Sequence, residues 1–334
     1  MLYIKSKNST DPHFNLAMEE YVLKYLNLAE EYLLLWQNEP AIIIGRHQNT
    51  LEEVNMDYTR ENNIHVVRRL SGGGAVYHDL GNLNFTFIRR AIRSELLDLK
   101  SFTQPVIHAL KKLGVNAEVS GRNDLTIEGK KFSGNAQYLY KNNILHHGTL
   151  LFDSDLSELN KALRVQADKI ESKGIKSVRS RVTNIREHIK GDQDTNINEF
   201  TALLRDAVAE VQGENFAEYT LGEKDYEGIR ALMQERYLTW QWNYGQSPAF
   251  NIKNSRRFAR GKVETLLEIK EGLIANCKIY GDFLGLVSLH DFEEGIKGIR
   301  YEEKDIDTFL QGQDMKKLFG GIERRELLSC LLGR

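Results

Sequence analysis

A glycine-rich stretch between two expected strands constrains this chain more than any other feature: residues 68–79 read RRLSGGGAVYHD. Three consecutive glycines let backbone amides approach an anion closely, because no Cβ stands in the way. Arg68 and Arg69, at the end of the preceding strand, supply planar donors that suit phosphate or carboxylate. The stretch lacks the Gly-Lys-Ser/Thr ending of a P-loop, and it lacks the spaced glycines and following helix of a dinucleotide-binding fold. It is therefore either a flexible hairpin loop or an anion site, and the paired arginines favour the anion site.

Size and composition indicate an ordinary globular protein of about two domains, because the chain has 334 residues, of which 41% are hydrophobic and 28% charged. The formal net charge of −2 suggests no general affinity for nucleic acid or anionic membranes. The longest apolar runs, Tyr32–Trp36 and Ala41–Ile44, are too short to span a bilayer, and the N-terminus lacks the pattern of a signal peptide. Cys277 and Cys330 make no disulfide framework. We expect a cytoplasmic enzyme with no membrane or nucleic-acid partner.

The hydrophobic pattern predicts a mixed α/β (α+β) chain with a large first domain and a small second one. Asp11 is a plausible N-cap and Pro12 a first helical residue, and apolar residues then repeat at helical spacing: Phe14, Ala17, Met18, Tyr21, Val22 and Tyr25. We expect strands at Tyr32–Trp36, Ala41–Gly45, Ile64–Arg69 and Leu83–Ile88, a short helix after Met56, a helix over 103–113, and an antiparallel meander over 115–152. Helices over 155–163, 198–211 and 225–240 should precede a connection over 240–250 and a hairpin of Val263–Ile269 with Leu273–Tyr280.

A second polar cluster comprises GRNDL at residues 121–125 and KFSGNA at residues 131–136. Asp124 would be a natural Mg²⁺ ligand, since that ion needs only one or two carboxylates besides phosphate oxygens. Lys131 begins a strand after a tight turn, where its ammonium could face a phosphate or could be merely solvated. The adjacent His146 and His147 should point to opposite faces of a strand, so they form a poor metal site. The basic stretch 169–181 is either a solvated loop or a flap over a polyphosphate.

Taken together, these motifs resemble the lipoate–protein ligase family in their order and spacing. The matching segments are RRLSGGGAVYHDLGNLNF, GRNDL, KFSGNAQ, HHGTLLF, SKGIKSVRSRVTN, IIIGRHQN and WQWNYGQSPAF. The resemblance implies the catalytic fold shared with biotin–protein ligases, a mixed sheet flanked by helices, over residues 1–245. It also implies the accessory α+β domain of the family's long form over residues 250–334.

The resemblance also assigns roles to individual residues. Lys131 matches the catalytic lysine that touches both the lipoyl carboxylate and the α-phosphate. The residues assigned to ATP and the adenylate are Arg69, Gly74, Ala75, Val76, Tyr77, Asp124, Lys131 and Lys173. Those assigned to lipoate are Arg68, Ser71, Gly73, Lys131 and His147, and Asp124 is the candidate Mg²⁺ ligand.

The implied activity is an ATP- and Mg²⁺-dependent activation of lipoate, or of octanoate, to an acyl-adenylate, with no permanently bound cofactor. Transfer to a carrier lysine follows, on lipoyl domains of 2-oxoacid dehydrogenase complexes or on the H-type carrier of glycine cleavage. A lipoyl or octanoyl transferase on the same fold would need an acyl-cysteine, and both cysteines follow residue 245. A non-catalytic binding module would be expected to lose Lys131 or the glycine loop, and this chain keeps both.

Overall fold

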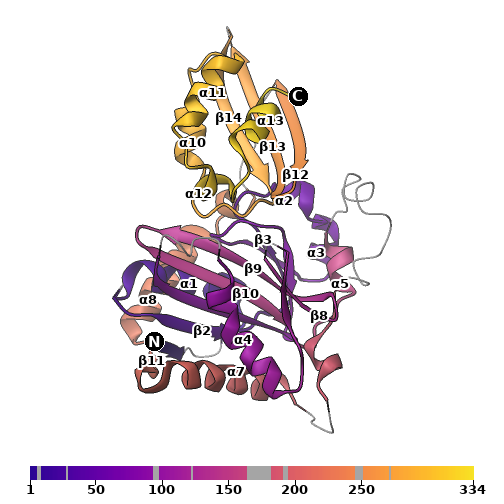
Figure 1. Ribbon diagram of the computed structural model, residues 1–334, viewed down its shortest axis with the longest axis vertical. Coiled ribbons are helices and arrows are strands. Elements are labelled where there is room, and N and C mark those ends of the chain that lie inside the picture. Colours follow the sequence, from indigo (N-terminus) through magenta and orange to yellow (C-terminus); the bar gives the residue numbers. More distant parts are fainter. Residues whose placement is uncertain are drawn as a thin grey trace. The chain divides into compact units, whose positions relative to one another are not determined.

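An eight-stranded mixed sheet forms the centre of the larger part of the molecule (Figure 1). This computed structural model describes residues 1–5, 9–27, 29–92, 98–121, 123–163, 182–190, 195–244, 251–270 and 272–334. By their internal contacts the residues divide into two units. Unit 1 contains Met1–Ile43, Leu51–Val67 and Val76–Thr239, and unit 2 contains Ile44–Thr50, Arg68–Ala75 and Trp240–Arg334. The chain is therefore of mixed α/β class, as its sequence predicts.

The strands and helices follow one another along the whole chain. The strands are β1 (Leu2–Lys5), β2 (Tyr32–Trp36), β3 (Ala41–Ile44), β4 (His65–Arg68), β5 (Val76–His78), β6 (Asn82–Arg90), β7 (Glu118–Ser120), β8 (Asp124–Ile127), β9 (Lys130–Tyr140), β10 (Asn143–Leu151), β11 (Ala217–Thr220), β12 (Ile252–Phe258), β13 (Gly261–Lys270) and β14 (Leu273–Gly281). The helices are α1 (Pro12–Tyr25), α2 (Thr50–Glu53), α3 (Met56–Glu61), α4 (Lys100–Lys112), α5 (Glu158–Ala162), α7 (Ile197–Gln212), α8 (Glu223–Leu232), α9 (Trp240–Asn243), α10 (His290–Gly295), α11 (Glu303–Gln311), α12 (Met315–Phe319) and α13 (Arg324–Leu331), with short turns η3 (Ile185–His188), η4 (Gly213–Asn215) and η5 (Met233–Tyr237).

Helices cover both faces of the eight-stranded sheet, whose order is β11-β1-β2-β6-β10-β9-β8-β7. Successive side chains of a strand point to opposite faces, and β6 and β10 show the consequence. Phe87 and His146 lie against Phe102 of α4, with ring centroids 6.3 Å and 4.5 Å away. Their neighbours Thr86 and His147 instead bond to Glu19 of α1. The sheet is therefore the middle layer between α1 and α4.

Helix α1 confirms the predicted start but corrects the predicted buried face. Asp11 is the N-cap, its side chain accepts from the His13 amide, and Pro12 is the first helical residue. Tyr25, expected on the buried face, is 60% exposed, whereas Glu19 and Glu20 are buried. Helix α1 packs against α8 as well as the sheet, so it has more than one buried side and needs polar partners inside.

The glycine-rich stretch lies between two strands, as predicted, but the second of these is β5 rather than the strand that begins near Leu83. Strands β4 and β5 flank β3 in a separate small sheet of order β4-β3-β5. Downstream, β7 to β10 form the predicted antiparallel meander. Its tight turns place Glu128 and Lys141 in the left-handed region, with φ of 51° and 52°.

The helix predicted over 225–240 is interrupted. Helix α8 ends at Leu232, and a π-helical turn, η5, follows over Met233–Tyr237. Within this turn Tyr237 becomes buried and donates to Glu20 Oε2 at 2.8 Å. The start of the expected connection is also helical, since α9 occupies Trp240–Asn243.

The C-terminal part of unit 2 is a three-stranded antiparallel sheet, β12-β13-β14, packed against α10 to α13. The hairpin of β13 and β14 is confirmed, but β12 was not predicted, because its sequence IKNSRRF is polar and more than half of its residues are exposed at the sheet edge. The core of this region includes both cysteines, Cys277 and Cys330. Among the helices of the described ranges, none combines the length and apolarity that a bilayer crossing requires.

Candidate active site

Lys131 is the second residue of β9, and its ammonium group lies beside Gly134 of the same strand rather than in the core. A register shift between Leu125 and Thr126 of β8 places Thr126 opposite Lys131 and Leu125 opposite Ser133. Gly134 leaves room for this side chain, because a Cβ at that position would stand 3.0 Å from Lys131 Nζ and would shift the ammonium by a few tenths of an ångström. The motif Lys-Phe-Ser-Gly therefore carries both the ammonium group and the space that this group occupies. The side chain of Lys131 stays 36% exposed, so a ligand can reach it.

Asp124, at the start of β8, is the ionic partner of Lys131. Its Oδ1 is 2.7 Å from Lys131 Nζ, but this oxygen makes no hydrogen bond among the described residues. Within the described ranges no three His, Cys, Asp or Glu side chains are grouped to hold a metal ion. Mg²⁺ bound with a nucleotide needs only one or two carboxylates, because phosphate oxygens and water complete its shell. Asp124 fits that requirement as a lone ligand.

The chain returns to Lys131 after residue 181. Val182 bridges Lys131 in parallel, and the Thr183 amide donates to the Lys131 carbonyl at 2.9 Å. These bonds occupy the backbone of Lys131 and leave its side chain available. The predicted adenylate loop 173–181, with Lys173, lies outside the described residues.

His147 belongs to a buried chain of hydrogen bonds that crosses from β2 to α1. Trp36 Nε1 donates to Thr86 Oγ1 at 3.0 Å, and this hydroxyl donates to Glu19 Oε1 at 2.5 Å. His147 Nδ1 lies 3.0 Å from the same carboxylate oxygen, so the hydrogen-bond pattern assigns its proton to Nδ1. Glu19 thereby fixes the orientation and the tautomer of the histidine that the family resemblance assigns to lipoate.

His146 points the other way, as predicted for neighbours on a strand. Its ring stacks on Phe102, and its nitrogens lie 3.3 Å from Gln137 Nε2 and 3.1 Å from Asn135 Oδ1. Burial, and then His147, hold the pKa of His146 well below its usual range. This histidine is a packed, neutral residue.

The glycine-rich loop, residues 68–75, forms part of unit 2 and is held by its own arginine. Arg69 Nε donates to Ser71 Oγ at 3.1 Å, and Arg69 Nη2 donates to the carbonyls of Gly72 and Gly74 at 2.7 and 2.8 Å. The loop also crosses Gly45 so closely that a Cβ there would lie 1.9 Å from the Gly73 oxygen. Arg69 and Ser71 are buried, whereas Gly74 is exposed. The open part of the loop is therefore its C-terminal half, at Gly74 and Ala75, which leads into Val76 and Tyr77 of β5.

Arg68 is also buried, at 7% exposure, and all its donor nitrogens bond to protein atoms. Nε donates to the Trp242 carbonyl, Nη1 to the carbonyls of Gly45, Arg46 and Gln48, and Nη2 to Thr50 Oγ1 and the Asn243 carbonyl, at 2.6 to 3.2 Å. Burial, and then Arg46, lower the pKa of Arg68 to about 10, so the group stays charged at neutral pH. Its hydrogen bonds connect residues 45–50 to α9.

The residues predicted for the site thus lie in two groups. Unit 1 holds Lys131, Asp124, His147, Val76 and Tyr77, and unit 2 holds Arg68, Arg69, Ser71, Gly73, Gly74 and Ala75. The chain's two cysteines are in neither group, because Cys277 and Cys330 are buried in the C-terminal core. Burial raises the pKa of the Cys330 thiol to about 11 and that of Cys277 still further.

Two family models match this chain. The model described as lipoyl protein ligase A/B catalytic domain matches residues 11–209, and the model described as bacterial lipoate protein ligase C-terminus matches residues 247–331. The chain belongs to the lipoate–protein ligase family. The chain is therefore an enzyme, a lipoate–protein ligase, as its motifs indicate.

Full-length relatives agree with this membership. The chain is 49% identical to the lipoate–protein ligase LplJ of Bacillus subtilis, over 99% of this chain and 100% of the relative. The similar solved structures include a P. falciparum protein, LipL1, in complex with lipoate, at a TM-score of 0.83 and 28% identity, over 100% of this chain and 99% of that one.

Two further structures cover less of this chain. A lipoate–protein ligase A bound with ATP has a TM-score of 0.62 and 28% identity, over 73% of this chain and 98% of that one. A bipartite ligase of Thermoplasma acidophilum, described with its E2 lipoyl domain, has a TM-score of 0.66 and 30% identity, over 75% of this chain and 98% of that one.

Glu19 and Gly134 had no predicted role, although Gly134 lies inside the motif KFSGNAQ. A glutamate on a helix face next to the apolar Met18 was the available signal for Glu19, because a buried carboxylate requires partners. The need for Gly134 could not be predicted, since it depends on the course of the Lys131 side chain.

Proposed function

We propose that this ligase activates lipoate with ATP to lipoyl-AMP and then transfers the lipoyl group to a carrier-protein lysine. The observation that carries the proposal is Lys131, an accessible ammonium that Gly134 leaves room for and whose ionic partner among the described residues is Asp124. When a ligand supplies its own negative charge, Lys131 can exchange its carboxylate partner for it. A buried and saturated lysine could not do so.

In the first step the lipoate carboxylate attacks the α-phosphorus of ATP, a new O–P bond forms, and pyrophosphate leaves. Two anions must approach each other, so a preorganised positive charge at the reacting centre lowers the barrier. Lys131 supplies that charge. Mg²⁺, held by Asp124 and phosphate oxygens, would add positive charge beside the leaving group.

In the second step the neutral amine of a carrier lysine attacks the lipoyl carbonyl carbon. The amide bond forms, the bond to AMP breaks, and the amine loses a proton to solvent. Lys131 stabilises the oxygen on which negative charge develops. No enzyme nucleophile is needed, which agrees with two buried cysteines whose pKa values are raised.

We assign the remaining contacts from the family resemblance, and the exposure of each residue decides whether it acts directly or through its neighbours. Gly74, Ala75, Val76 and Tyr77 are proposed to cradle the adenylate, with Arg69 holding their loop in shape. Arg68, Ser71 and Gly73 are proposed to act on lipoate through the same loop, since Arg68 and Ser71 are themselves buried. His147, fixed by Glu19, is proposed to line the far end of the lipoate pocket.

The acceptors we propose are lipoyl domains of 2-oxoacid dehydrogenase complexes and the H-type carrier of glycine cleavage. The similarity to the Thermoplasma acidophilum ligase, which is described together with its E2 lipoyl domain, supports the first class. The catalytic domain is proposed to span residues 1–245 and the accessory domain residues 250–334. The matches at 11–209 and 247–331 support this division.

ATP–pyrophosphate exchange with lipoate tests the proposal, because exchange requires reversible formation of the adenylate without a carrier. We expect lipoate-dependent exchange and then transfer to an added lipoyl domain. Octanoate should also support exchange, since an apolar slot discriminates such tails by only about 1–3 kcal/mol. A chain that binds lipoate without exchange would be a binding module. A chain that transfers only from an acylated carrier, without ATP, would be a transferase.

A further inference from the structure

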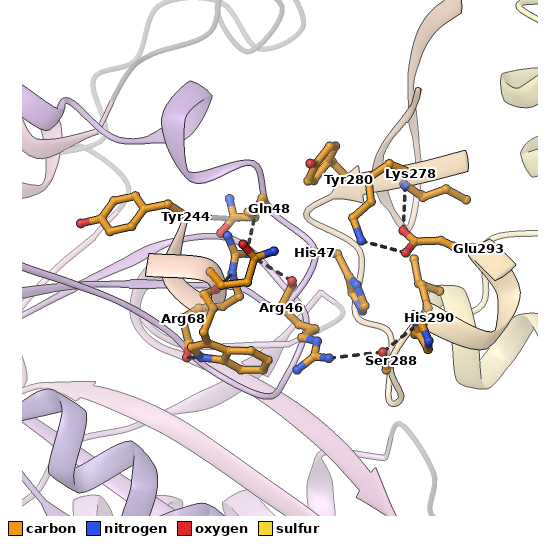
Figure 2. Close-up of a pocket in the computed structure, with 14 residues that line it drawn as sticks. Arg46, His47, Gln48, Arg68, Tyr244, Lys278, Tyr280, Ser288, His290 and Glu293 are labelled. Carbon is orange, nitrogen blue, oxygen red and sulfur yellow. Dashed lines mark hydrogen bonds and ion pairs between the residues drawn. The ribbon is translucent and has the colours of Figure 1, made fainter. Parts of the chain in front are cut away.

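A polar cavity of about 290 Å³ lies wholly within unit 2 (Figure 2). Of the described residues that line it, only Arg68 has a role in the reaction proposed above, and that role is exerted through the glycine-rich loop. The wall of the cavity comes from several separate parts of the chain, and Arg68 at the end of β4 is one of them. Arg46, His47 and Gln48 come from the stretch after β3, Trp242 and Tyr244 from α9 and its end, and Lys278, Tyr280 and His290 from β14 and α10. Residues far apart in sequence thus converge on one space, which is partly open to solvent.

The cavity has a surplus of positive charge. Among the described residues that line it, Arg46, Arg68 and Lys278 are positively charged and Glu293 is the single carboxylate. Both oxygens of that carboxylate are already used, since one accepts from Lys278 Nζ at 2.8 Å and the other from the Ile279 amide at 3.0 Å. The remaining excess of two positive charges favours an anionic ligand.

The arginine at the wall is held in place before any ligand arrives. The Arg46 guanidinium lies 4.3 Å from the centre of the Trp242 ring, and its Nη2 donates to Ser288 Oγ at 3.3 Å. Figure 2 shows Arg46 and Ser288 joined in this way, beside His290. A guanidinium fixed by stacking is preorganised for a planar pair of oxygen acceptors.

Gln48 supplies a second indication of a ligand that accepts hydrogen bonds. Its side chain is only 1% exposed, and its Oε1 accepts from the Gly45 amide at 2.9 Å. Its Nε2, however, has no hydrogen-bond partner among the described residues. A buried amide donor without an acceptor costs about 1–3 kcal/mol, and a bound oxygen atom would remove that cost.

The neighbouring His47 adds no charge. Burial, and then Arg46, hold the pKa of His47 well below its usual range, so its ring is neutral where it stacks on Phe283 at 5.0 Å. The positive charge of the cavity therefore comes from Arg46, Arg68 and Lys278 and not from His47.

We propose that this cavity is an anion site for a diphosphate group, from free inorganic pyrophosphate or from a nucleotide. A diphosphate presents several oxygens along its length and can meet Arg46, Lys278 and the Gln48 amide together. A single carboxylate would leave part of the charge and most of the volume unmatched. The site is built from unit 2 alone and does not depend on adenylation at Lys131.

Isothermal titration calorimetry of the full-length protein with sodium pyrophosphate, at matched ionic strength and without Mg²⁺, tests the site. All titrations use the Lys131→Ala background, which weakens pyrophosphate binding at the reaction centre. In that background we expect saturable binding that Lys278→Gln weakens at least ~10-fold, because a charge-assisted contact is lost. Lys253→Gln is the matched control, since Lys253 also pairs with a buried glutamate, Glu264 at 3.2 Å, but does not line the cavity.

A second variant protects the result against misfolding. His290 is exposed, so His290→Ala should leave the thermal melt unchanged and still weaken pyrophosphate binding severalfold. ADP bound more tightly than pyrophosphate would identify a nucleotide as the source, and the reverse would identify free pyrophosphate. Orthophosphate should bind more weakly than either. The proposal is wrong if no binding heat appears, or if folded Lys278→Gln and His290→Ala proteins both titrate like the Lys253→Gln control.

Discussion

Lys131 and Arg68 are both cations in family motifs, but their surroundings differ. Lys131 is 36% exposed, and its described side-chain partner is Asp124 alone. Arg68 is 7% exposed and makes six hydrogen bonds to five backbone carbonyls and one hydroxyl. The lysine keeps donors for a ligand, whereas the arginine uses all of its donors within the protein. A cation in a motif can therefore serve chemistry directly, or it can hold the loop on which chemistry depends.

From this contrast we expect Lys131→Ala to lower the adenylation rate strongly and to leave the stability of the fold almost unchanged. Adenylation should fall about 100- to 1000-fold, the usual result of deleting a preorganised charge-stabilising donor. The free energy of unfolding should change by less than about 1 kcal/mol, because partly exposed ion pairs contribute little. Lipoate-dependent ATP–pyrophosphate exchange and urea denaturation measure the two quantities.

The control is Lys130→Ala, which removes the exposed lysine next to it on β9. That variant should keep exchange within about twofold of the parent. A folded Lys131→Ala protein with parental exchange would remove Lys131 from the mechanism.

Arg68→Met should show the opposite pattern, with stability affected first. The substitution keeps much of the apolar volume but leaves several buried carbonyls without donors, so we expect a loss of about 2–3 kcal/mol in unfolding free energy. Urea denaturation followed by fluorescence measures it. An unchanged denaturation midpoint together with lost exchange would instead give Arg68 a direct role in substrate binding.

Cys277 and Cys330 can be compared with Lys131 and Arg68, because both thiols are buried and neither is assigned a role in the reaction. A Cys277→Ala, Cys330→Ala double variant should lose roughly 1–3 kcal/mol of stability, because both thiols fill the C-terminal core. Lipoylation of a carrier domain should remain within a few-fold of the parent. A folded double variant that makes lipoyl-AMP but cannot transfer it would indicate a thioester intermediate.

The smallest effect is expected from alkylation of the native protein. Burial raises the pKa of Cys330 to about 11, and that of Cys277 is also raised, so both thiols stay protonated through neutral and mildly basic pH. Since the thiolate is the nucleophile, iodoacetamide near pH 8 should label neither. Intact mass spectrometry checks this, with urea-unfolded protein as the control that should take two labels. Rapid labelling of the folded chain would show that one thiol is reachable.

The hydrophobic pattern predicted the elements correctly where burial alone determines the choice of residues. Tyr32–Trp36 is a strand with the predicted bounds, and Asp11 with Pro12 begins α1 as predicted. The hydrophobic pattern did not predict elements whose position is set by tertiary contacts. Edge strand β12 is polar because one side faces solvent.

The same limit applies to the site. The sequence supplied Lys131 and Asp124, and the structure places them 2.7 Å apart. It could not show that Arg68 has no donor left, because its acceptors come from residues 45–50 and 242–243, far away along the chain. Nor could it show that Glu19 is the partner of His147, since that pair joins a helix to a strand 128 residues later.

The close crossing of Gly45 and Gly73 has a mechanical consequence. With only 1.9 Å between a hypothetical Cβ and the Gly73 oxygen, the two stretches have no side chain between them that could act as a spacer. A shift of either backbone must displace the other, so residues 44–50 and 68–75 must move together. Attempts to redesign the substrate preference of this ligase by grafting a different glycine-rich loop should therefore exchange both stretches together, as a single cassette.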